Sequence, residues 1–291
     1  MKSLFLSTLL CCAAALGAQD LPVTNVYSFR IQPTADGALQ LSNPRYLTAW
    51  NARGYNNQPS FLQPNELLLT VGMTGRAQTD IHLLDLTALT RTRLLATGES
   101  EYSARGSADG KAFYTVRVDT ETPSLQRLWR FSRTLADRGT VVLPDARRVG
   151  YYHWLDADRV AYFDVGTPNT LVVANLRYGT TQRLTPDIGR CFQALPNGDM
   201  AYVHKVTPTR WEIKALDRQT LASRVLAETL AGSEDFVVLE DSSLLMGKGS
   251  KLFRYVAGKW REAADLSKYR LRKITRLAHN GAGVLVVVNA E

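Results

Sequence analysis

The chain has 291 residues, of which 45% are hydrophobic and 21% charged, and this balance excludes an intrinsically disordered protein. Its formal net charge of +8 raises the question of a nucleic-acid partner. The 35 Lys and Arg are scattered among 27 Asp and Glu, however, and no recognition-helix pattern accompanies the short basic stretches, so we expect no nucleic-acid partner.

Residues 1–18 have the features of a secretory signal peptide. Lys2 is followed by an apolar stretch from Leu4 to Leu16 that is too short to span a bilayer, and cleavage is expected after Ala18. The sequence therefore predicts a periplasmic or secreted protein with no transmembrane segment in the mature chain. Lipoprotein anchoring through Cys11 or Cys12 is the alternative, but neither cysteine has both the small and the aliphatic residue that a lipidation motif places before it.

Removal of this segment would leave one cysteine, Cys191, so the mature chain can form no internal disulfide. Free cysteines are among the most buried residues in proteins. We therefore expect Cys191 to be buried and the fold to depend on its hydrophobic core.

Most of the remaining chain repeats one pattern about every 40 to 50 residues, which is the spacing of four-stranded propeller blades. In each repeat a cluster of turn-forming residues follows an initial strand, and a strand rich in β-branched and aromatic residues comes next. These second strands are expected at residues 67–71, 112–118, 160–165, 200–206, 243–246 and 284–288. Most are continuous apolar runs, as expected where both faces of a sheet are packed.

The two ends of the chain each supply half a repeat. Residues 26–31 and 39–42 predict two strands without a preceding pair, and about residues 273–279 and 284–289 predict two strands without a following pair. Joined, the four strands complete a sixth blade and leave no free edge between the first and last blades. Residues 223–231, the best helical candidate, are interpreted as a strand and a loop.

The predicted fold class is therefore all-β. We expect residues 19–291 to form a single domain, a six-bladed β-propeller of four-stranded antiparallel blades, with the ring closed by N-terminal strands that complete the last blade. An open two-domain sandwich is the alternative, but it leaves the half-repeats at the ends unexplained.

The first repeat contains Gln58-Pro59-Ser60-Phe61, then Pro64-Asn65, Thr79-Asp80-Ile81 and Asp85-Leu86. This order resembles the TolB-like propeller family of exported Trp-Asp-type repeats, and later repeats match more loosely. The resemblance implies a propeller fold, a periplasmic or extracellular setting and a tendency to bind peptides or protein partners. TolB itself has a further N-terminal domain, for which we see no room between Gln19 and the first strand, so TolB's own role is not carried over.

Motifs for catalysis or cofactor binding are absent from the sequence. The four histidines, His82, His153, His204 and His279, fall in different repeats, and no Cys pair or His-Glu-x-x-His spacing occurs. A Gly-x-Ser-x-Gly elbow and a glycine-rich phosphate loop are also missing. We therefore expect no catalytic residue, no cofactor and no metal, although a propeller can assemble metal ligands from distant repeats around its axis.

Candidate binding residues come from the strand that begins each repeat, because equivalent positions there approach the central opening of a propeller. Counting back seven residues from each turn Asn or Asp gives one position per repeat. The predicted ligand-binding residues are Gln58, Tyr102, Tyr151, Arg190, Glu234 and Lys273, with His153 close by. We expect Tyr151, Arg190 and Glu234 to project toward one opening. The alternative is a wet rim that binds nothing, with its aromatic residues packed between blades.

These residues favour a non-catalytic scaffold that recognises a peptide, protein or glycan with one face of the ring. Glu234 is the only acid among the six positions, and the basic and phenolic groups favour an anionic ligand. The alternative is a propeller hydrolase, lyase or lactonase that acts on a sugar or sugar acid in the central channel. Fold alone does not decide between the two.

Overall fold

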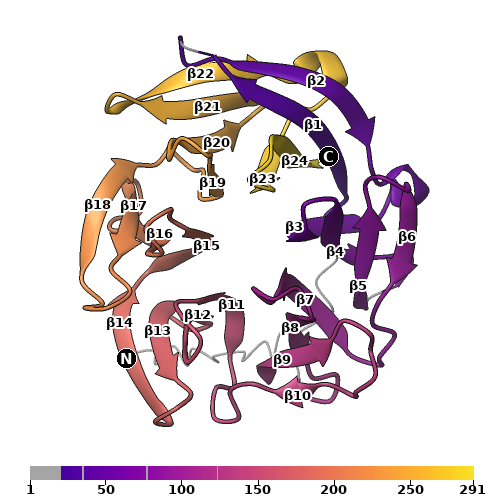
Figure 1. Ribbon diagram of the computed structural model, residues 1–291, viewed down its shortest axis with the longest axis vertical. Helices are drawn as coiled ribbons and strands as arrows, with labels where there is room; N and C mark the ends of the chain where they lie inside the picture. The colour runs from indigo at the N-terminus through magenta and orange to yellow at the C-terminus, as the bar shows by residue number, and fades with distance from the viewer. Residues whose placement is uncertain (1–20, 35, 77, 123) are drawn as a thin grey trace, which may run out of the picture.

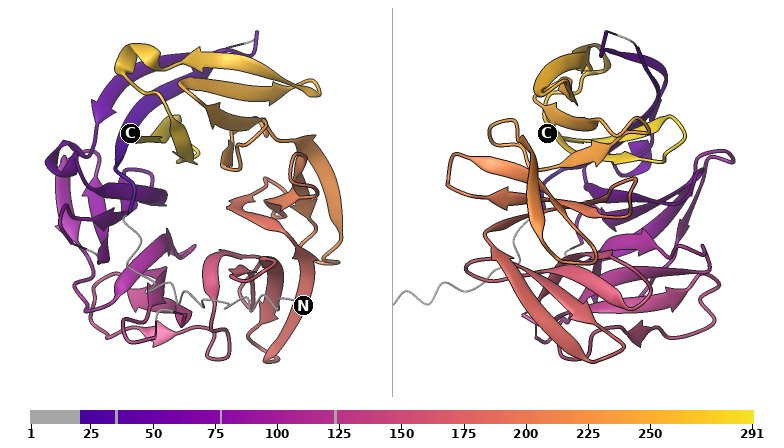
Figure 2. Two further views of the ribbon diagram at one scale, coloured as in Figure 1. Left: turned by 180° about the vertical axis from the view of Figure 1, so that it is seen from behind. Right: turned by 60° about the vertical axis from the view of Figure 1, so that its left-hand side comes forward.

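The computed structural model describes residues 21–34, 36–76, 78–122 and 124–291. They form six four-stranded antiparallel sheets arranged as blades around a central channel (Figure 1). Views from behind and from the side show the six sheets standing around one axis (Figure 2). The predicted all-β, six-bladed propeller is therefore confirmed. The predicted signal peptide and its cleavage site lie outside the described residues.

Blades 1 to 5 each use four consecutive strands, numbered here from the channel outward. Blade 1 consists of β3 (Tyr55–Gln63), β4 (Glu66–Gly72), β5 (Thr79–Asp85) and β6 (Thr90–Arg93). Blade 2 consists of β7 (Ser100–Gly106), β8 (Ala112–Val118), β9 (Gln126–Ser132) and β10 (Thr140–Val141). Blade 3 consists of β11 (Val149–Trp154), β12 (Arg159–Asp164), β13 (Thr170–Asn175) and β14 (Thr180–Pro186).

Blade 4 consists of β15 (Ile188–Ala194), β16 (Met200–Lys205), β17 (Trp211–Leu216) and β18 (Ser223–Glu228). Blade 5 consists of β19 (Phe236–Val238), β20 (Leu244–Lys248), β21 (Lys251–Val256) and β22 (Lys259–Asp265). Short 3-10 helices occupy Ala49–Asn51 and Ser267–Tyr269. The strand assignment of β18 agrees with the interpretation of residues 223–231 as a strand and a loop.

Blade 6 closes the ring with strands from both ends of the chain. Its order from the channel outward is β23 (Ile274–His279), β24 (Val284–Ala290), β1 (Thr24–Pro33) and β2 (Leu39–Tyr46). β1 pairs antiparallel with β24 from Thr24 opposite Ala290 to Arg30 opposite Val284. This pairing joins the first and last parts of the fold without a free edge between them, as the two half-repeats predicted.

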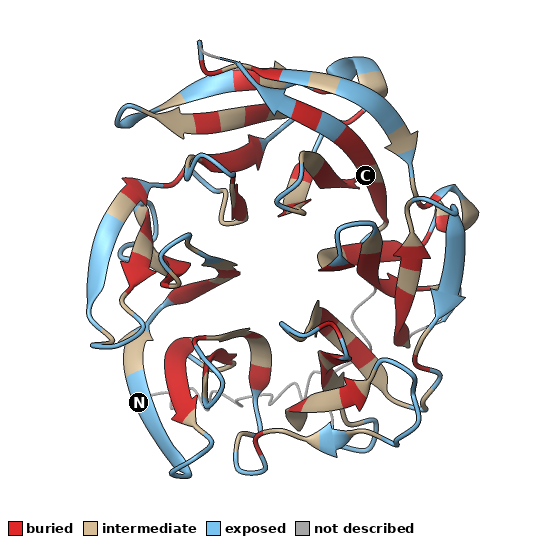
Figure 3. Ribbon diagram, viewed as in Figure 1, coloured by how far each residue is buried: buried red, intermediate tan, exposed pale blue. Residues whose placement is uncertain are grey.

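The hydrophobic core lies between neighbouring blades. In β4, Leu67 and Leu69 pack in one cluster with Val286 of blade 6, whereas Leu68 packs in another cluster with Phe113 of blade 2. All five side chains are fully buried, and each contributes about 1.5–3 kcal/mol to stability. Outer strands such as β14 and β18 are mostly exposed (Figure 3). Two packed faces explain why the second strands of most blades are largely apolar.

Candidate functional site

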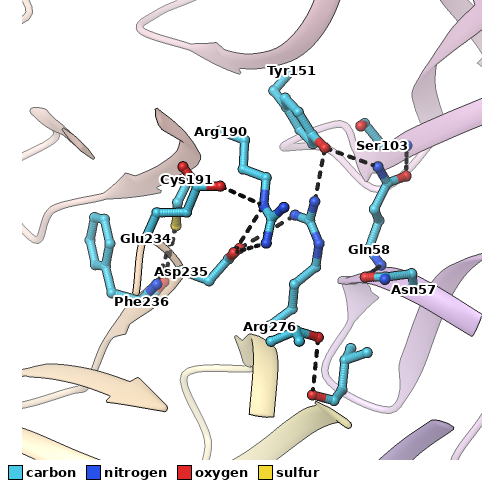
Figure 4. A network of polar contacts seen from close by, with 12 residues as sticks. Asn57, Gln58, Ser103, Tyr151, Arg190, Cys191, Glu234, Asp235, Phe236 and Arg276 are labelled. Atoms are coloured by element: carbon cyan, nitrogen blue, oxygen red, sulfur yellow. Dashed lines mark hydrogen bonds and ion pairs between the residues drawn. The ribbon is translucent and has the colours of Figure 1, made fainter. Parts of the chain in front are cut away.

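Polar groups from all six blades meet in the middle of the channel (Figure 4), five of them side chains and the sixth the backbone amide of Ser103. We call this group the axial network. Its members, one from each blade in chain order, are Gln58, Ser103, Tyr151, Arg190, Asp235 and Arg276.

Beta-bulges direct most of these side chains toward the axis. Five innermost strands are bulged: β3 between Asn57 and Ser60, β7 between Tyr102 and Arg105, β11 between Val149 and Tyr152, β15 between Ile188 and Phe192, and β23 between Ile274 and Arg276. Gln58 and Ser103 have left-handed φ angles of 53° and 55°. A bulge breaks the alternation of side chains along a strand and re-aims one of them. Asp235 directly precedes β19 and lies outside the regular pairing.

Asp235 is the centre of charge in the axial network. Its carboxylate accepts hydrogen bonds from Nε and Nη2 of Arg190 at 3.0 and 2.7 Å, and from Nη1 of Arg276 at 3.4 Å. The side chains of Asp235 and Arg276 are only 10% and 11% exposed. A carboxylate buried to this extent is stable in its charged form only when cations are in contact with it, and the two guanidinium groups meet that requirement.

Tyr151 connects blades on opposite sides of the channel. Nη2 of Arg276 donates a hydrogen bond to its hydroxyl at 2.8 Å, and Nε2 of Gln58 donates a longer one at 3.4 Å. The side-chain carbonyl oxygen of Gln58 in turn accepts hydrogen bonds from the backbone amide of Ser103 at 2.7 Å and from the Thr70 hydroxyl at 2.8 Å. The network therefore crosses the axis, and its polar groups are largely occupied by one another.

Charge and burial shift the pKa values of groups in and beside this network. Burial lowers the pKa of Arg276, but Tyr151 and Asp235 outweigh it, so the net shift is upward and the guanidinium stays charged. Burial raises the pKa of the Cys191 thiol to about 12, which keeps it protonated and unreactive. The thiol donates to the Phe236 carbonyl at 3.3 Å across the junction of blades 4 and 5. Cys191 is thus buried, as the sequence predicted.

Two cavities occupy the ends of the channel, and the axial network separates them. Along the innermost strands, Lys273 lines the smaller cavity before the network position, and Trp154 and Ala278 line the larger cavity after it. The network members Arg190, Asp235 and Arg276 themselves line the smaller cavity, and Leu277 lines both. We name them the N-side cavity, of about 390 Å³, and the C-side cavity, of about 680 Å³. The space beside the network itself is about 50 Å³. The side chains of the axial network thus divide the channel into two mouths.

Aromatic side chains and uncharged polar groups dominate the C-side cavity. Phe61, Tyr114, His153 and Trp154 line it, and Arg105 lies between it and the axial network. The Trp154 indole N–H is buried and has no hydrogen-bond partner among the described residues. Burial, and secondarily Arg105, lowers the pKa of His153 to about 3, so its imidazole is neutral near pH 7. This cavity offers flat apolar surfaces beside polar side chains such as Gln193.

The N-side cavity is built from blades 4, 5 and 6 and is richer in charge. Its lining includes four cations and two acids, namely Arg190, Lys248, Lys273, Arg276, Glu234 and Asp235. Glu234 lies 3.2 Å from Nε of Arg190 and 2.9 Å from Nζ of Lys205. Lys248 and Lys273 are exposed at the rim.

The structure brings together four of the seven residues that the sequence singled out. Gln58, Tyr151 and Arg190 belong to the axial network, and Glu234 contacts Arg190 beside it. Their predicted role in ligand binding stays a prediction, since their observed partners are other residues of the protein.

The remaining three predicted residues lie elsewhere. Lys273 is at the rim of the N-side cavity, and His153 lines the C-side cavity, so the two are on opposite sides of the network. Tyr102 packs between blades 2 and 3 against a cluster that includes Val116 and Val149. One face therefore does not contain all seven residues.

Sequence reasoning missed Ser103, Asp235 and Arg276. Counting back seven residues assumes that all hairpins between first and second strands have equal length. Ser103 stands six positions before Asp109, Asp235 six before Asp241, and Arg276 four before Asn280. The count thus selected Tyr102, Glu234 and Lys273 instead. Each missed residue is polar or charged and lies within three positions of the residue that the count selected. Which of these neighbouring residues faces the axis depends on bulges and turn lengths, and those are features of the tertiary structure.

No group of three or more His, Cys, Asp or Glu side chains that could hold a metal ion occurs among the described residues. The histidines are spread over the ring: His82 stacks on Trp50, His204 lies 2.8 Å from Lys214, and His279 lies 3.4 Å from Glu240. The helices in the described part of the chain are all too short to cross a membrane.

No protein-family model and no curated protein matches the sequence, whereas solved structures match the fold. TolB from Acinetobacter baumannii has 14% identity and a TM-score of 0.57, covering 94% of this chain and 65% of that one. A protein assigned to TolB, from Agrobacterium tumefaciens, has 10% identity and a TM-score of 0.63, covering 93% and 99%. A chain of a nidogen/laminin complex has 9% identity and a TM-score of 0.61, covering 88% and 97%.

These similarities concern the fold. The chain spans 65% of the length of the Acinetobacter TolB, and all three identities are below 15%. The TolB-like resemblance deduced from the first repeat is confirmed as a resemblance of propeller architecture.

Proposed function

We propose that the protein is an exported, non-catalytic propeller that binds a peptide segment of a protein partner in its C-side cavity. The observation that carries this proposal is the contrast within the channel. The polar groups of the axial network are largely bonded to one another, whereas the C-side cavity is lined by the aromatic side chains of Phe61, Tyr114 and Trp154. Export rests on the signal-peptide features of residues 1–18.

The C-side cavity has the size and chemistry of a recognition site. Its volume of about 680 Å³ is within the range of ligand pockets and fits a few side chains of a peptide. Tyr114 and Trp154 pack with ring centroids 5.1 Å apart and form one aromatic wall. The Arg105 guanidinium is anchored by a hydrogen bond to the Phe192 carbonyl at 2.9 Å. A partner with an aromatic or aliphatic side chain next to a carboxylate would match this arrangement.

The same residues support binding over catalysis. A histidine with a pKa of about 3 is a weak base at neutral pH and is a poor general acid-base catalyst. Asp156, the acid in the cavity lining, is ion-paired with Arg159 at the exposed rim. The hydrolase, lyase or lactonase alternative needs a properly placed acid or base. His279, the second histidine of the lining, has a pKa lowered by burial and lies 3.4 Å from Glu240. Likeness to the propeller of the nidogen/laminin complex is consistent with a protein partner.

The test is affinity capture from an envelope fraction of the source organism, with the mature protein as bait. We expect the double variant R105A/W154A to lose the partner that the parent protein captures. The matched control is R177A/Y178A, which removes an arginine and an exposed aromatic residue from an outer turn of blade 3. Equal capture by the parent and R105A/W154A would refute the site. Capture that survives protease treatment of the fraction but not glycosidase treatment would identify a glycan ligand instead.

A further inference from the structure

The N-side cavity has a surplus of positive charge. Asp235 is shared by Arg190 and Arg276, and Glu234 is shared by Arg190 and Lys205. Both acids, Asp235 and Glu234, are thus already ion-paired with cations at the floor and wall of the cavity. No ion pair is found for Lys248 or Lys273 within the described part of the chain, so four lining cations face two lining acids.

Lys248 and Lys273 are placed by a tight contact between blades 5 and 6. Gly247, at the end of β20, lies so close to Ile274 that a β-carbon there would come within 2.2 Å of the isoleucine side chain. The Ile274 amide donates to the Gly249 carbonyl at 2.9 Å. The residues that flank the two lysines are therefore in direct contact.

The backbone of Lys273 is also fixed by the closing strand β24. Its amide donates to the Asn289 side chain at 2.9 Å, and its carbonyl accepts from the Ala290 amide at 2.9 Å. Two rigidly based lysines next to a concave surface lose less freedom on binding than two lysines on a mobile loop.

The floor and wall of the cavity indicate the kind of anion. The Arg190 side chain is 35% exposed, so its guanidinium can be reached from the cavity although Asp235 holds one edge. Trp211 provides an apolar wall, with Nζ of Lys205 4.4 Å from its ring centroid. The volume of about 390 Å³ accommodates a small organic molecule and not only a simple ion. Two free lysines above a guanidinium are suited to a ligand with two separated negative groups.

We propose that the N-side cavity is a second binding site, separate from the C-side cavity, for a small organic anion that carries at least two carboxylate or phosphate groups. Lys248 and Lys273 bind its charged groups from the rim, and Arg190 contacts it from below.

The test is isothermal titration of the mature protein with citrate and, separately, with pyrophosphate. We expect saturable binding of at least one probe at one site per chain, weakened about tenfold or more by K248Q/K273Q, because a hydrogen bond to a charged group contributes about one order of magnitude in affinity. Citrate alone would assign a carboxylate ligand and pyrophosphate alone a phosphate ligand. Absence of saturable binding of both would overturn the proposal.

Two controls separate the site from general charge effects. K259Q/K268Q removes two exposed lysines from outside both cavities and should bind like the parent protein. R105A/W154A should also bind the probe like the parent, because neither Arg105 nor Trp154 lines the N-side cavity. A loss in K259Q/K268Q equal to that in K248Q/K273Q would mean that net charge causes the binding, and would refute the site. Melting temperatures of all variants verify that they are folded.

Discussion

The two mouths of the channel are built from the same innermost strands and yet have different chemistry. The N-side cavity is lined by lysines, arginines and two ion-paired acids, whereas the C-side cavity is lined mainly by aromatic and uncharged polar side chains. Lys273, directly before β23, lines the N-side cavity, Arg276 of β23 belongs to the axial network, and Ala278 of β23 lines the C-side cavity. A segment of six residues thus passes through three environments.

The position of a residue along its innermost strand decides which cavity it lines, and the blade to which it belongs matters less. A ligand approaches the ring from one face, so residues of different blades at the same depth in the channel can contact it together. Residues of one blade on opposite sides of the axial network cannot. Lys273 and His153 therefore line different cavities although both were predicted for one site. The axial network is the boundary between them.

The largest expected effect comes from opening the ring, because both mouths depend on closure. Deletion of residues 19–45 removes β1 and most of β2 and exposes the edge of β24. We expect insoluble or aggregated protein, since a long unpaired edge recruits other chains. Size-exclusion chromatography and thermal melting provide the measurement. A monomer that melts at the parent temperature would show that closure by β1 and β2 is dispensable.

The next effect concerns the boundary itself. D235N removes the carboxylate charge that Arg190 and Arg276 share, and leaves a guanidinium group 11% exposed with one partner fewer. We expect the free energy of unfolding to fall by about 3 kcal/mol, measured by urea denaturation. E262Q is the matched control, because Glu262 pairs with Lys251 on the surface and such pairs contribute less than about 1 kcal/mol. Equal losses in the two variants would mean that the axial network is not a stabilising element.

A smaller effect should distinguish the C-side cavity by its pH dependence. The folded-state pKa of His153 is lowered to about 3, so below pH 6.5 the unfolded chain binds the proton more readily than the folded one. Its contribution to stability is therefore present above about pH 6.5 and lost as the pH falls, by about 2 kcal/mol near pH 4.5.

We expect H153Q to flatten the dependence of unfolding free energy on pH between about 6.5 and 4.5, measured by urea denaturation at each pH. H204Q is the comparison, because burial and Lys214 also lower the pKa of His204, but by less than the pKa of His153 is lowered, so H204Q should flatten the dependence less. An unchanged slope in H153Q would mean that the imidazole is hydrated in the cavity.

The smallest expected effect is a difference in salt dependence between the mouths. Anion binding in the N-side cavity should weaken by about tenfold between low salt and about 0.15 M, because the exposed lysines are screened. Binding of the protein partner in the C-side cavity should change by about twofold or less, since aromatic contacts dominate there. Titrations at three salt concentrations give both slopes. Equal slopes would remove the distinction between the two sites.

The candidate site could be predicted only in part from the sequence. Three residues predicted from the innermost strands, Gln58, Tyr151 and Arg190, do face the axis, and their role in ligand binding stays a prediction. Asp235 and Arg276 were missed because hairpins of different length shift the axial position along the strand. The network residues bind one another across the channel although they lie up to 125 positions apart in the sequence, and no local sequence pattern predicts such contacts.

The number of blades, their second strands and the closure by both chain ends could be predicted from the amino-acid sequence. Those features follow from local chemistry, because runs such as Leu67 to Val71 can be buried only between two sheets, and turn residues mark where strands end. Only the tertiary structure decided which polar side chains satisfy each other and which remain free for a ligand. The reason is physical: hydrogen bonds and ion pairs depend on distances of a few tenths of an ångström between distant segments, and bulges set those distances.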